Sequence, residues 1–169
     1  MKLKKPNLRY ITIKKSKVHN NGIFAKKDVK TGTKIIEYVG EIVTKEEGTS
    51  RAIKQYSLAR KNKELGSVYV FELNKKYDLD GNFKYNVARF INHSCSPNCR
   101  FTIKKNRIWI IAKKNIKKGE ELNYDYGYDL EDYKSHKCKC GSKNCIGYIV
   151  ATEHRKKLQR ILNKKKKAN

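Results

Sequence analysis

Short stretches rich in β-branched and aromatic residues alternate with turn-forming residues along much of the chain. Such stretches cover residues 10–13, 34–39 and 67–73, and this composition is typical of β-strands. Residues 100–103 and 107–112 flank the sequence Lys-Lys-Asn and predict a β-hairpin. The whole pattern predicts a mostly β domain of many short strands.

Three shorter segments have helical spacing. Residues 46–63 are the strongest candidate for an internal helix, although few apolar residues fall on one face. Residues 86–92 predict a single helical turn. Near the C-terminus, Leu158, Ile161 and Leu162 share a helical face and predict a short amphipathic helix. The fold class we expect is therefore β with short helices.

Charge along the chain is strongly biased toward bases. Lys and Arg number 41 against 16 Asp and Glu, which gives a formal net charge of +25 over 169 residues. Residues 1–17 hold seven of these bases and no acid, and residues 154–169 hold eight. The excess predicts a polyanionic partner, most simply nucleic acid, although a lysine-rich solubilising surface also explains it.

Two kinds of apolar segment are missing from the sequence. No uncharged apolar run reaches the length of a transmembrane helix. The first residues carry charge without the apolar stretch and cleavage site of a secretory signal. We therefore expect a protein that is neither membrane-spanning nor secreted through a signal peptide.

Three of the five cysteines, Cys138, Cys140 and Cys145, lie within eight residues. Thiolates at this spacing can reach one ion, and zinc requires a fourth ligand to complete a tetrahedron. Cys95 is the preferred fourth ligand and Cys99 the alternative. Four sulfur ligands leave no open position, so the spacing predicts a structural zinc site in a reducing compartment. Three unrelated reduced thiols are the competing explanation.

Two further windows mix polar and apolar residues. Residues 89–99 read Arg-Phe-Ile-Asn-His-Ser-Cys-Ser-Pro-Asn-Cys, which a helix end followed by a Ser-Pro turn would also explain. Residues 119–132 hold six of the 16 acids and no base, and this window predicts a local site for a cation. Within it Tyr124, Tyr126 and Tyr128 alternate, so a strand would place them on one face, in a site or in an aromatic core.

Taken together and in this order, these segments resemble the SET-domain protein lysine methyltransferases that carry a zinc-binding post-SET segment. Residues 89–98 resemble the family's central motif nearly letter for letter, and residues 120–126 resemble its second motif. Residues 138–145, Cys-Lys-Cys-Gly-Ser-Lys-Asn-Cys, resemble the post-SET cysteines, and residues 21–25 and 37–41 resemble the opening strands. The wording is most similar to trithorax-type histone H3 methyltransferases.

The resemblance implies a fold of small β-sheets around a pseudoknot-like threaded crossing. In that fold the segment carrying Asn92 and His93 passes beneath the loop that leads to Tyr126. The implied organisation is a basic N-terminal extension over residues 1–9, a SET domain over 10–130, a post-SET zinc segment over 131–150 and a basic C-terminal helix or tail over 151–169.

The resemblance also implies a cleft for S-adenosylmethionine. Asn92 and His93 match the family's cofactor-binding pair, Arg89 and Tyr69 match further contacts, and Tyr126 faces the same molecule. The bound methyl group would pass from a sulfonium to a neutral lysine amine by in-line displacement.

An early loop and a late aromatic residue complete the implied cofactor site. Asn20, Asn21 and Gly22 occupy the loop where a G-x-G sequence is usual, with Asn20 in place of the first glycine. Asn tolerates unusual backbone angles better than most residues, so we expect the loop to keep its shape. Tyr148 matches the aromatic residue that covers the cofactor, and Ile146 is a weaker candidate for that contact.

Four tyrosines match the family's lysine channel. Tyr126 matches the catalytic tyrosine, whose hydroxyl orients the amine and the transferring methyl group. Tyr38 and Tyr69 match aromatic residues that line the channel. Tyr124 matches the position that sets the number of methyl groups, and its hydroxyl leaves less room than phenylalanine would, so we predict mainly monomethylation.

The substrate implied is a basic protein, most simply a histone tail received by the acidic window while the basic termini contact nucleosomal DNA. The implied location is the nucleus, or a host nucleus if the chain belongs to a virus or an intracellular bacterium. Two alternatives remain open: a methyltransferase for a non-histone basic protein, and a non-catalytic zinc-containing module that binds chromatin or DNA.

Overall fold

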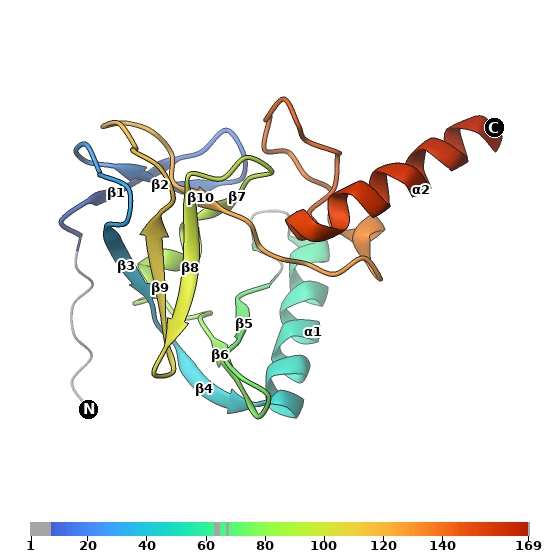
Figure 1. The fold of residues 1–169 in the computed structure, drawn as a ribbon. Coiled ribbons are helices and arrows are strands. Elements are labelled where there is room, and N and C mark those ends of the chain that lie inside the picture. Colours follow the sequence, from blue (N-terminus) through green and yellow to red (C-terminus); the bar gives the residue numbers. More distant parts are fainter. Residues whose placement is uncertain (1–7, 63–64, 67, 169) are drawn as a thin grey trace.

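The computed structural model describes residues 8–62, 65–66 and 68–168, so most of the expected N-terminal extension lies outside the described residues. Within them ten short strands form four small sheets, and two α-helices stand outside the sheets (Figure 1). This confirms the mostly β fold class. The strands are β1 (Ile11–Lys15), β2 (Asn21–Ala25), β3 (Lys34–Tyr38), β4 (Glu41–Thr44), β5 (Val70–Glu72), β6 (Tyr77–Asp80), β7 (Asn92–His93), β8 (Cys99–Lys104), β9 (Arg107–Ala112) and β10 (Asn123–Tyr124).

The central three-stranded sheet has the order β3-β9-β8, with both pairs antiparallel. The predicted hairpin is confirmed, and Lys105 and Asn106 turn it with positive φ angles. Strand β9 lies between the other two and is almost entirely apolar, because a central strand covered on both faces has no position for a solvated side chain. Ile108 and Ile110 of this strand are fully buried.

A single large core joins the sheets. Ile23 of β2, Ile110 of β9 and Leu122 before β10 are fully inaccessible to solvent, and all belong to this core. The residues come from strands far apart in sequence, so the core forms only when the sheets assemble. Burial of each such side chain stabilises the fold by about 1.5–3 kcal/mol.

The shortest sheet forms the crossing that the resemblance implies. Strand β7 pairs in parallel with β10, so that Asn92 lies opposite Asn123 and His93 opposite Tyr124. The amide of Asn98 donates to the Glu121 carbonyl at 2.8 Å, and Asn98 and Asn123 each accept the other's backbone N–H. Two strands that are distant in sequence are thereby held side by side.

The third sheet, ordered β4-β6-β5, carries helix α1 (Lys45–Lys61). Thr44 caps the helix by accepting the Glu47 N–H, and acidic residues in the first turn and basic residues in the last complement the helix dipole. The expected thin apolar face is confirmed, since only Gly48 and Ala59 are buried. Strand β5 is shorter than the predicted run over 67–73.

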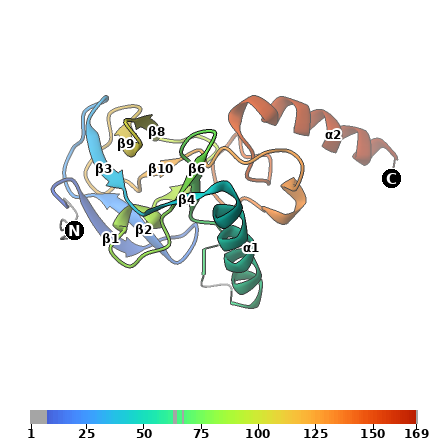
Figure 2. The ribbon, with the colours of Figure 1, turned by 90° about the horizontal axis from the view of Figure 1, so that it is seen from below.

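Helix α2 (Arg155–Ala168) extends away from the sheets in both views (Figures 1 and 2). Its predicted apolar face is confirmed: Leu158 is fully buried, and Leu162 packs with it in a second, smaller core around Tyr133 and Val150. The predicted turn at residues 86–92 is a 3-10 helix over Val87–Phe90. None of the described helices is long and apolar enough to cross a membrane.

Candidate active site and metal centre

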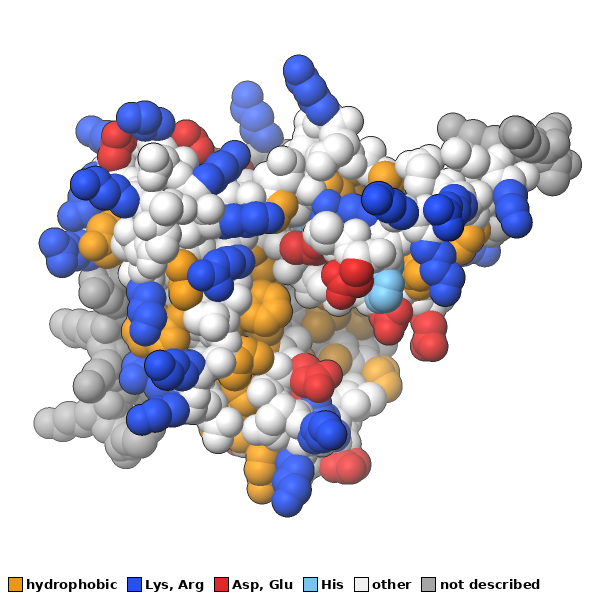
Figure 3. Space-filling model, viewed as in Figure 1, with side chains coloured by type: hydrophobic (Ala, Val, Ile, Leu, Met, Phe, Trp, Pro, Cys, Tyr) orange, Lys and Arg blue, Asp and Glu red, His pale blue; other side chains and the backbone are white. Residues whose placement is uncertain are grey.

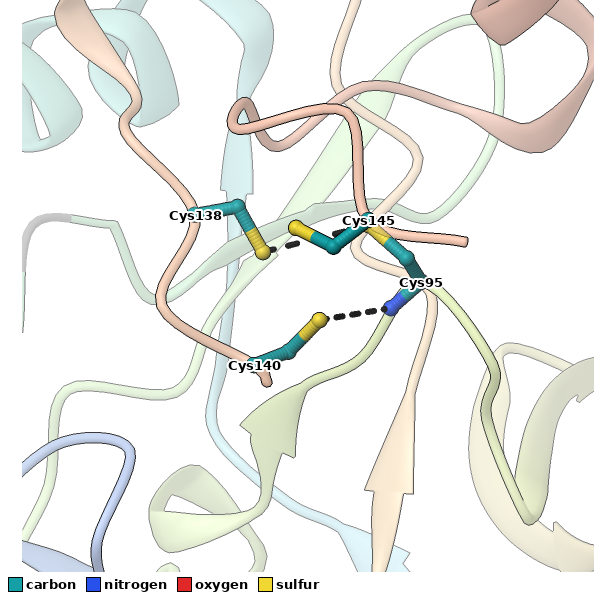
Figure 4. Close-up of side chains that lie close together, drawn as sticks. All are labelled: Cys95, Cys138, Cys140 and Cys145. Carbon is teal, nitrogen blue, oxygen red and sulfur yellow. Dashed lines mark hydrogen bonds between the residues drawn. The ribbon is translucent and has the colours of Figure 1, made fainter. Parts of the chain in front are cut away.

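Four cysteine side chains point toward one another where the C-terminal segment meets the centre of the chain (Figure 4). The sulfur atoms of Cys95, Cys138, Cys140 and Cys145 all lie within 4.8 Å of one another. The separation between the Cys95 and Cys138 sulfurs is 3.9 Å. Zinc–sulfur bonds of about 2.3 Å in a tetrahedron place the sulfurs about 3.8 Å apart, so the four thiols fit one zinc ion.

The polar surroundings of the sulfurs also fit a metal site. The Cys95 N–H points at the Cys140 sulfur at 3.4 Å, and Ser142 Oγ lies 2.8 Å from the same sulfur. Burial alone would raise the pKa of the Cys140 thiol, but these hydrogen bonds outweigh it and lower the pKa to about 6. A thiolate is the form that binds a metal, so Cys140 is prepared as a ligand by its neighbours.

Cys99 is not part of this cluster. It is 1% exposed and packs in the large core, and burial raises the pKa of its thiol to about 12. The choice between Cys95 and Cys99 as the fourth ligand is therefore decided in favour of Cys95. The reason is the turn after β7, which directs the buried Cys95 toward the C-terminal cysteines and returns Cys99 to the large core at the start of β8.

The four predicted channel tyrosines are linked to one another, three of them through ring contacts and Tyr69 through its backbone carbonyl. The Tyr38 hydroxyl donates to the Tyr69 carbonyl at 2.9 Å, and the Tyr124 and Tyr126 ring centroids are 5.0 Å apart. Phe71 joins the pairs, with centroids 4.7 Å from Tyr38 and 5.8 Å from Tyr124. Burial raises the pKa of Tyr38, Tyr124 and Tyr126, so these hydroxyls stay protonated at neutral pH.

Tyr126 is fixed at both its backbone and its hydroxyl. Its N–H donates to His93 Nδ1 at 3.2 Å, and its hydroxyl donates to the Ile91 carbonyl at 3.0 Å. Because Nδ1 accepts, the neutral His93 ring carries its proton on Nε2, which lies 3.6 Å from the Cys95 sulfur. Burial lowers the pKa of His93 to about 4, so the ring is neutral. It lies between the Tyr126 backbone and the cysteine cluster.

The predicted cofactor loop meets the central motif through Glu121. The Asn92 side-chain amide donates to Glu121 Oε1 at 2.8 Å and to the Asn21 carbonyl at 3.3 Å. A Cβ atom on Gly22 would lie 2.3 Å from Glu121 Oε1, so a side chain there would displace the carboxylate that binds Asn92. Asn20 adopts a φ of 41°, a backbone angle that asparagine tolerates better than most residues. That the loop keeps the family's shape stays a prediction.

Arg89 and Tyr69, two of the predicted cofactor contacts, lie against each other. The guanidinium carbon is 5.6 Å from the Tyr69 ring centroid, and Nη1 donates to Asn82 at 3.1 Å. The Arg89 Nε atom is buried without a hydrogen-bond partner among the described residues. Buried donors are costly to leave unpaired, so this atom fits the acceptor of a bound polar ligand.

Tyr148 lies with the C-terminal core. Its ring makes an edge contact with Tyr133 at 5.0 Å, and Ile146 packs in the same cluster. Backbone bonds between Cys138 and Gly147 and between Ile149 and His136 fold the segment back on itself. The covering role of Tyr148 stays a prediction, since its described ring contact is with Tyr133.

The acids of residues 119–132 fall into two groups, one bonded inside the protein and one exposed. Glu121 is committed to Asn92 and Ser16, and Asp125 accepts from Arg155 and from Thr152. The remaining acids of the window are exposed; they are Glu120, Asp129, Glu131 and Asp132. Several acidic side chains lie below the start of α2, on a face that also carries many basic ones (Figure 3). The sequence identified the acidic window but gave no sign that Glu121 and Asp125 are internal connectors.

Comparison with known proteins gives the context for this geometry. The family model described as SET domain matches residues 20–127. Histone-lysine N-methyltransferase trr of Drosophila melanogaster is 40% identical over 150 residues, which are 85% of this chain and 6% of that protein. Histone-lysine N-methyltransferase 2D of Homo sapiens is 37% identical over 141 residues, 80% of this chain and 2% of that protein.

A third relative is Histone-lysine N-methyltransferase trithorax of Drosophila virilis, 35% identical over 151 residues, 87% of this chain and 4% of that protein. The chain therefore spans only a few per cent of the length of these relatives. The family model covers the tyrosine cluster, the β7–β10 crossing and the early loop. On this match and these identities, the chain belongs to the SET-domain family.

Proposed function

We propose that this chain transfers a methyl group from S-adenosylmethionine to the ε-amine of a lysine in a basic protein, most simply a histone. The observation that carries the proposal is the Tyr126 arrangement. Its backbone is bonded to His93 and its hydroxyl to Ile91, beside the rings of Tyr124 and Tyr128. One hydroxyl is thus fixed where a buried aromatic cluster meets the predicted cofactor pair.

The residues proposed to hold the cofactor surround that crossing. S-adenosylmethionine, when bound, supplies a methyl group on a positively charged sulfur. Asn92 and His93 would bind the cofactor at the edge of strand β7, and Arg89 would donate a hydrogen bond to it from its buried Nε atom. The early loop would line one side of the cofactor through Asn20, Asn21 and Gly22, and Tyr148 would cover it. One structural zinc ion would be bound by Cys95, Cys138, Cys140 and Cys145.

The tyrosine cluster would receive the lysine. Its chemistry follows from burial, because the amine must lose a proton to attack, and free lysine has a pKa of about 10.4. An apolar aromatic channel disfavours the ammonium form. Tyr38 and Tyr69 would line the channel and Tyr126 would orient the amine nitrogen. Alignment of the reacting groups can supply effective molarities of roughly 10^5–10^8 M.

The deciding experiment is transfer of tritiated methyl groups onto purified histones, nucleosomes and other abundant basic proteins. Tyr126→Phe is the matched control, and its rate should fall on the order of a hundredfold, since a small loss of alignment costs about that much. Calorimetry with zinc-loaded protein measures cofactor uptake separately. Folded protein that neither binds the cofactor nor transfers methyl groups would instead be the non-catalytic chromatin- or DNA-binding module.

We further propose monomethylation as the main product. Tyr124 is 6% exposed and stacks on Phe71, so its hydroxyl reduces the space around the amine that further methyl groups would need. Mass spectra of products from the wild-type protein and from Tyr124→Phe should show mainly one methyl group and then two or three. Efficient trimethylation by the wild-type protein contradicts this proposal.

The basic helix α2 supports a proposed contact with nucleosomal DNA, and hence a nuclear location. Its buried apolar face anchors it, while Lys156, Lys157, Arg160 and Lys164 are exposed. Phosphate contacts of this kind weaken steeply with salt. The exposed acids Asp129 and Asp132 would contact the basic histone tail of the substrate. We also propose that the chain consists of a basic N-terminal extension (1–9), a SET domain (10–130), a post-SET zinc segment (131–150) and a basic C-terminal helix or tail (151–169).

Charge reversal tests the DNA contact. Lys157→Glu with Arg160→Glu should lower the affinity for nucleosomes and reduce the slope of log affinity against log salt by roughly one for each phosphate that the variant no longer binds. Lys75→Glu, at the distant β5–β6 turn, is the matched control. Equal activity on peptide and nucleosome, without any salt dependence, contradicts the proposal.

A further inference from the structure

Arg155, the first residue of α2, leaves the exposed basic face of that helix and turns inward. Its side chain is 12% exposed, against the 31% exposure of Arg51 on α1. It donates to the Asp125 carboxylate, to the Val150 carbonyl and to the Cys95 carbonyl. One guanidinium therefore contacts three separate segments: the stretch that follows β10 and carries Tyr126, the end of the post-SET segment, and a residue of the cysteine cluster.

Asp125 is the central acceptor of this arrangement. It lies between Tyr124 and Tyr126, and its Oδ2 accepts from Arg155 at 2.9 Å and from the Thr152 N–H at 3.0 Å. The Thr152 hydroxyl donates to the same oxygen. The other oxygen, Oδ1, accepts the Gly127 N–H and lies 3.7 Å from His93 Nδ1.

The hydrogen bonds to Asp125 restrict both its carboxylate and the backbone that follows it. The carboxylate cannot rotate without breaking bonds to Arg155 and Thr152, and its own backbone is contiguous with the Tyr126 N–H that donates to His93. A bidentate or branched arginine contact gives angular definition that a lysine point charge lacks. The start of α2 is therefore joined directly to the residue that precedes Tyr126 in the chain.

We infer that Arg155 is a positioning residue for Tyr126, acting through Asp125, and that the segment after the cysteines is a working part of the site. This inference rests on the proposed methyl transfer for its kinetic consequence. Arg155 itself touches none of the four channel tyrosines in the described contacts. Its role is to hold the Asp125 carboxylate, and with it the Tyr126 backbone, at a fixed angle to His93.

Hydrogen exchange tests the positioning without any need for activity. Arg155→Ala should accelerate exchange of the Tyr126 amide at least tenfold, while amides of the β8–β9 hairpin and the bound zinc content stay at wild-type levels. Thr152→Val removes one hydroxyl bond to Asp125 and should give a smaller change in the same direction. Arg60→Ala, an exposed arginine at the end of α1, is the charge-matched control.

Kinetics give the second readout. Arg155→Ala should lower kcat about ten- to a hundredfold while KM for the peptide changes less than threefold, because alignment rather than binding is impaired. Arg155→Lys keeps the charge and the aliphatic stem, and should recover part of the rate; it also replaces Ala if the Ala variant does not fold.

Two results overturn the inference. One is a Tyr126 amide that exchanges at the wild-type rate in folded Arg155→Ala and Arg155→Lys. The other is faster exchange spread evenly over the hairpin as well, which would mean a general loss of stability. If the wild-type protein transfers no methyl group yet the Tyr126 amide responds as expected, the proposed function fails and the positioning role stands.

Discussion

The large β core and the C-terminal cysteine segment are stabilised in different ways. In the core, fully buried residues such as Ile23 and Ile110 come from several strands and pack together. Residues 131–150 contain one short 3-10 helix and a single isolated bridge, between Lys137 and Tyr148. Their apolar support is limited to a small cluster whose fully buried members are Val150 and Leu158.

This difference means that the two regions respond to different perturbations. A segment with little secondary structure and a small core lacks the apolar burial needed to offset its conformational entropy. A zinc ion bound by the four cysteines would supply the missing free energy, because binding that occurs only in the folded segment stabilises it. The contacts of Arg155 with Asp125 and Cys95 connect the cysteine cluster to the segment that follows β10 and carries Tyr126.

Metal removal should have the largest effect and should be confined to one region. Chelation, or Cys145→Ala, is expected to abolish methyl transfer and to expose residues 131–150 to protease, since three thiols no longer complete a tetrahedron. Zinc content measured by atomic spectrometry should fall to near zero.

Cys99→Ala is the matched control for metal removal. Cys99 packs in the large core and lies outside the cluster, so zinc content should stay at one ion per chain while stability falls modestly. Loss of zinc in this variant, or a Cys145→Ala protein that remains fully active, would remove the distinction between the two regions.

Truncation in the large core should act globally. Ile110→Ala removes a side chain that is completely buried in the central strand β9, and such truncations cost about 2–5 kcal/mol. The urea midpoint of the cooperative transition should fall accordingly, with zinc-loaded protein used throughout. A variant whose midpoint is unchanged would show that β9 is not central to the cooperative unit.

Truncation in the small core should act locally. Leu158→Ala removes the apolar anchor of α2, and residues near Tyr133 and Tyr148 lose their packing partner. We expect faster hydrogen exchange in α2 and in residues 146–150, with little change in the β8–β9 hairpin. A uniform acceleration across both regions would mean that the two cores unfold together.

The smallest effect is expected at the early loop. Asn20 already adopts a φ of 41°, a conformation that glycine reaches without strain. Asn20→Gly should therefore change stability by less than about 1 kcal/mol and leave cofactor affinity within about twofold. Asn20→Val changes the same position in the opposite direction, because a β-branched residue at a positive φ is strained. The cofactor affinity measured by calorimetry should therefore fall.

Much of the fold follows from local pattern alone. The β8–β9 hairpin, helix α1, the turn at 86–92 and the apolar face of α2 all form where the sequence places them, because short-range spacing and turn chemistry determine each one. Strand β5 is the weaker case, since only the middle of the expected run pairs with β6. Strand ends depend on the partner strand as well as on composition.

The chemistry of the site divides in the same way. The spacing of Cys138, Cys140 and Cys145 identified three of four cluster members, because it depends on neighbours in sequence. The expected strand through the alternating tyrosines ends at Tyr124, although the Tyr124 and Tyr126 rings do lie together. The choice of Cys95 over Cys99 depends on which way one turn directs two side chains. A one-dimensional pattern does not contain that direction.

The sequence by itself therefore determined the fold class, the basic character and the residue types available for chemistry. Only the tertiary structure decided that β7 lies parallel to β10, that Glu121 joins Asn92 to the early loop, and that Arg155 reaches Asp125. The physical reason is that the side-chain bonds among these join residues 29 to 30 positions apart. Their partners are selected by burial and geometry after the chain has folded, and no local periodicity records them.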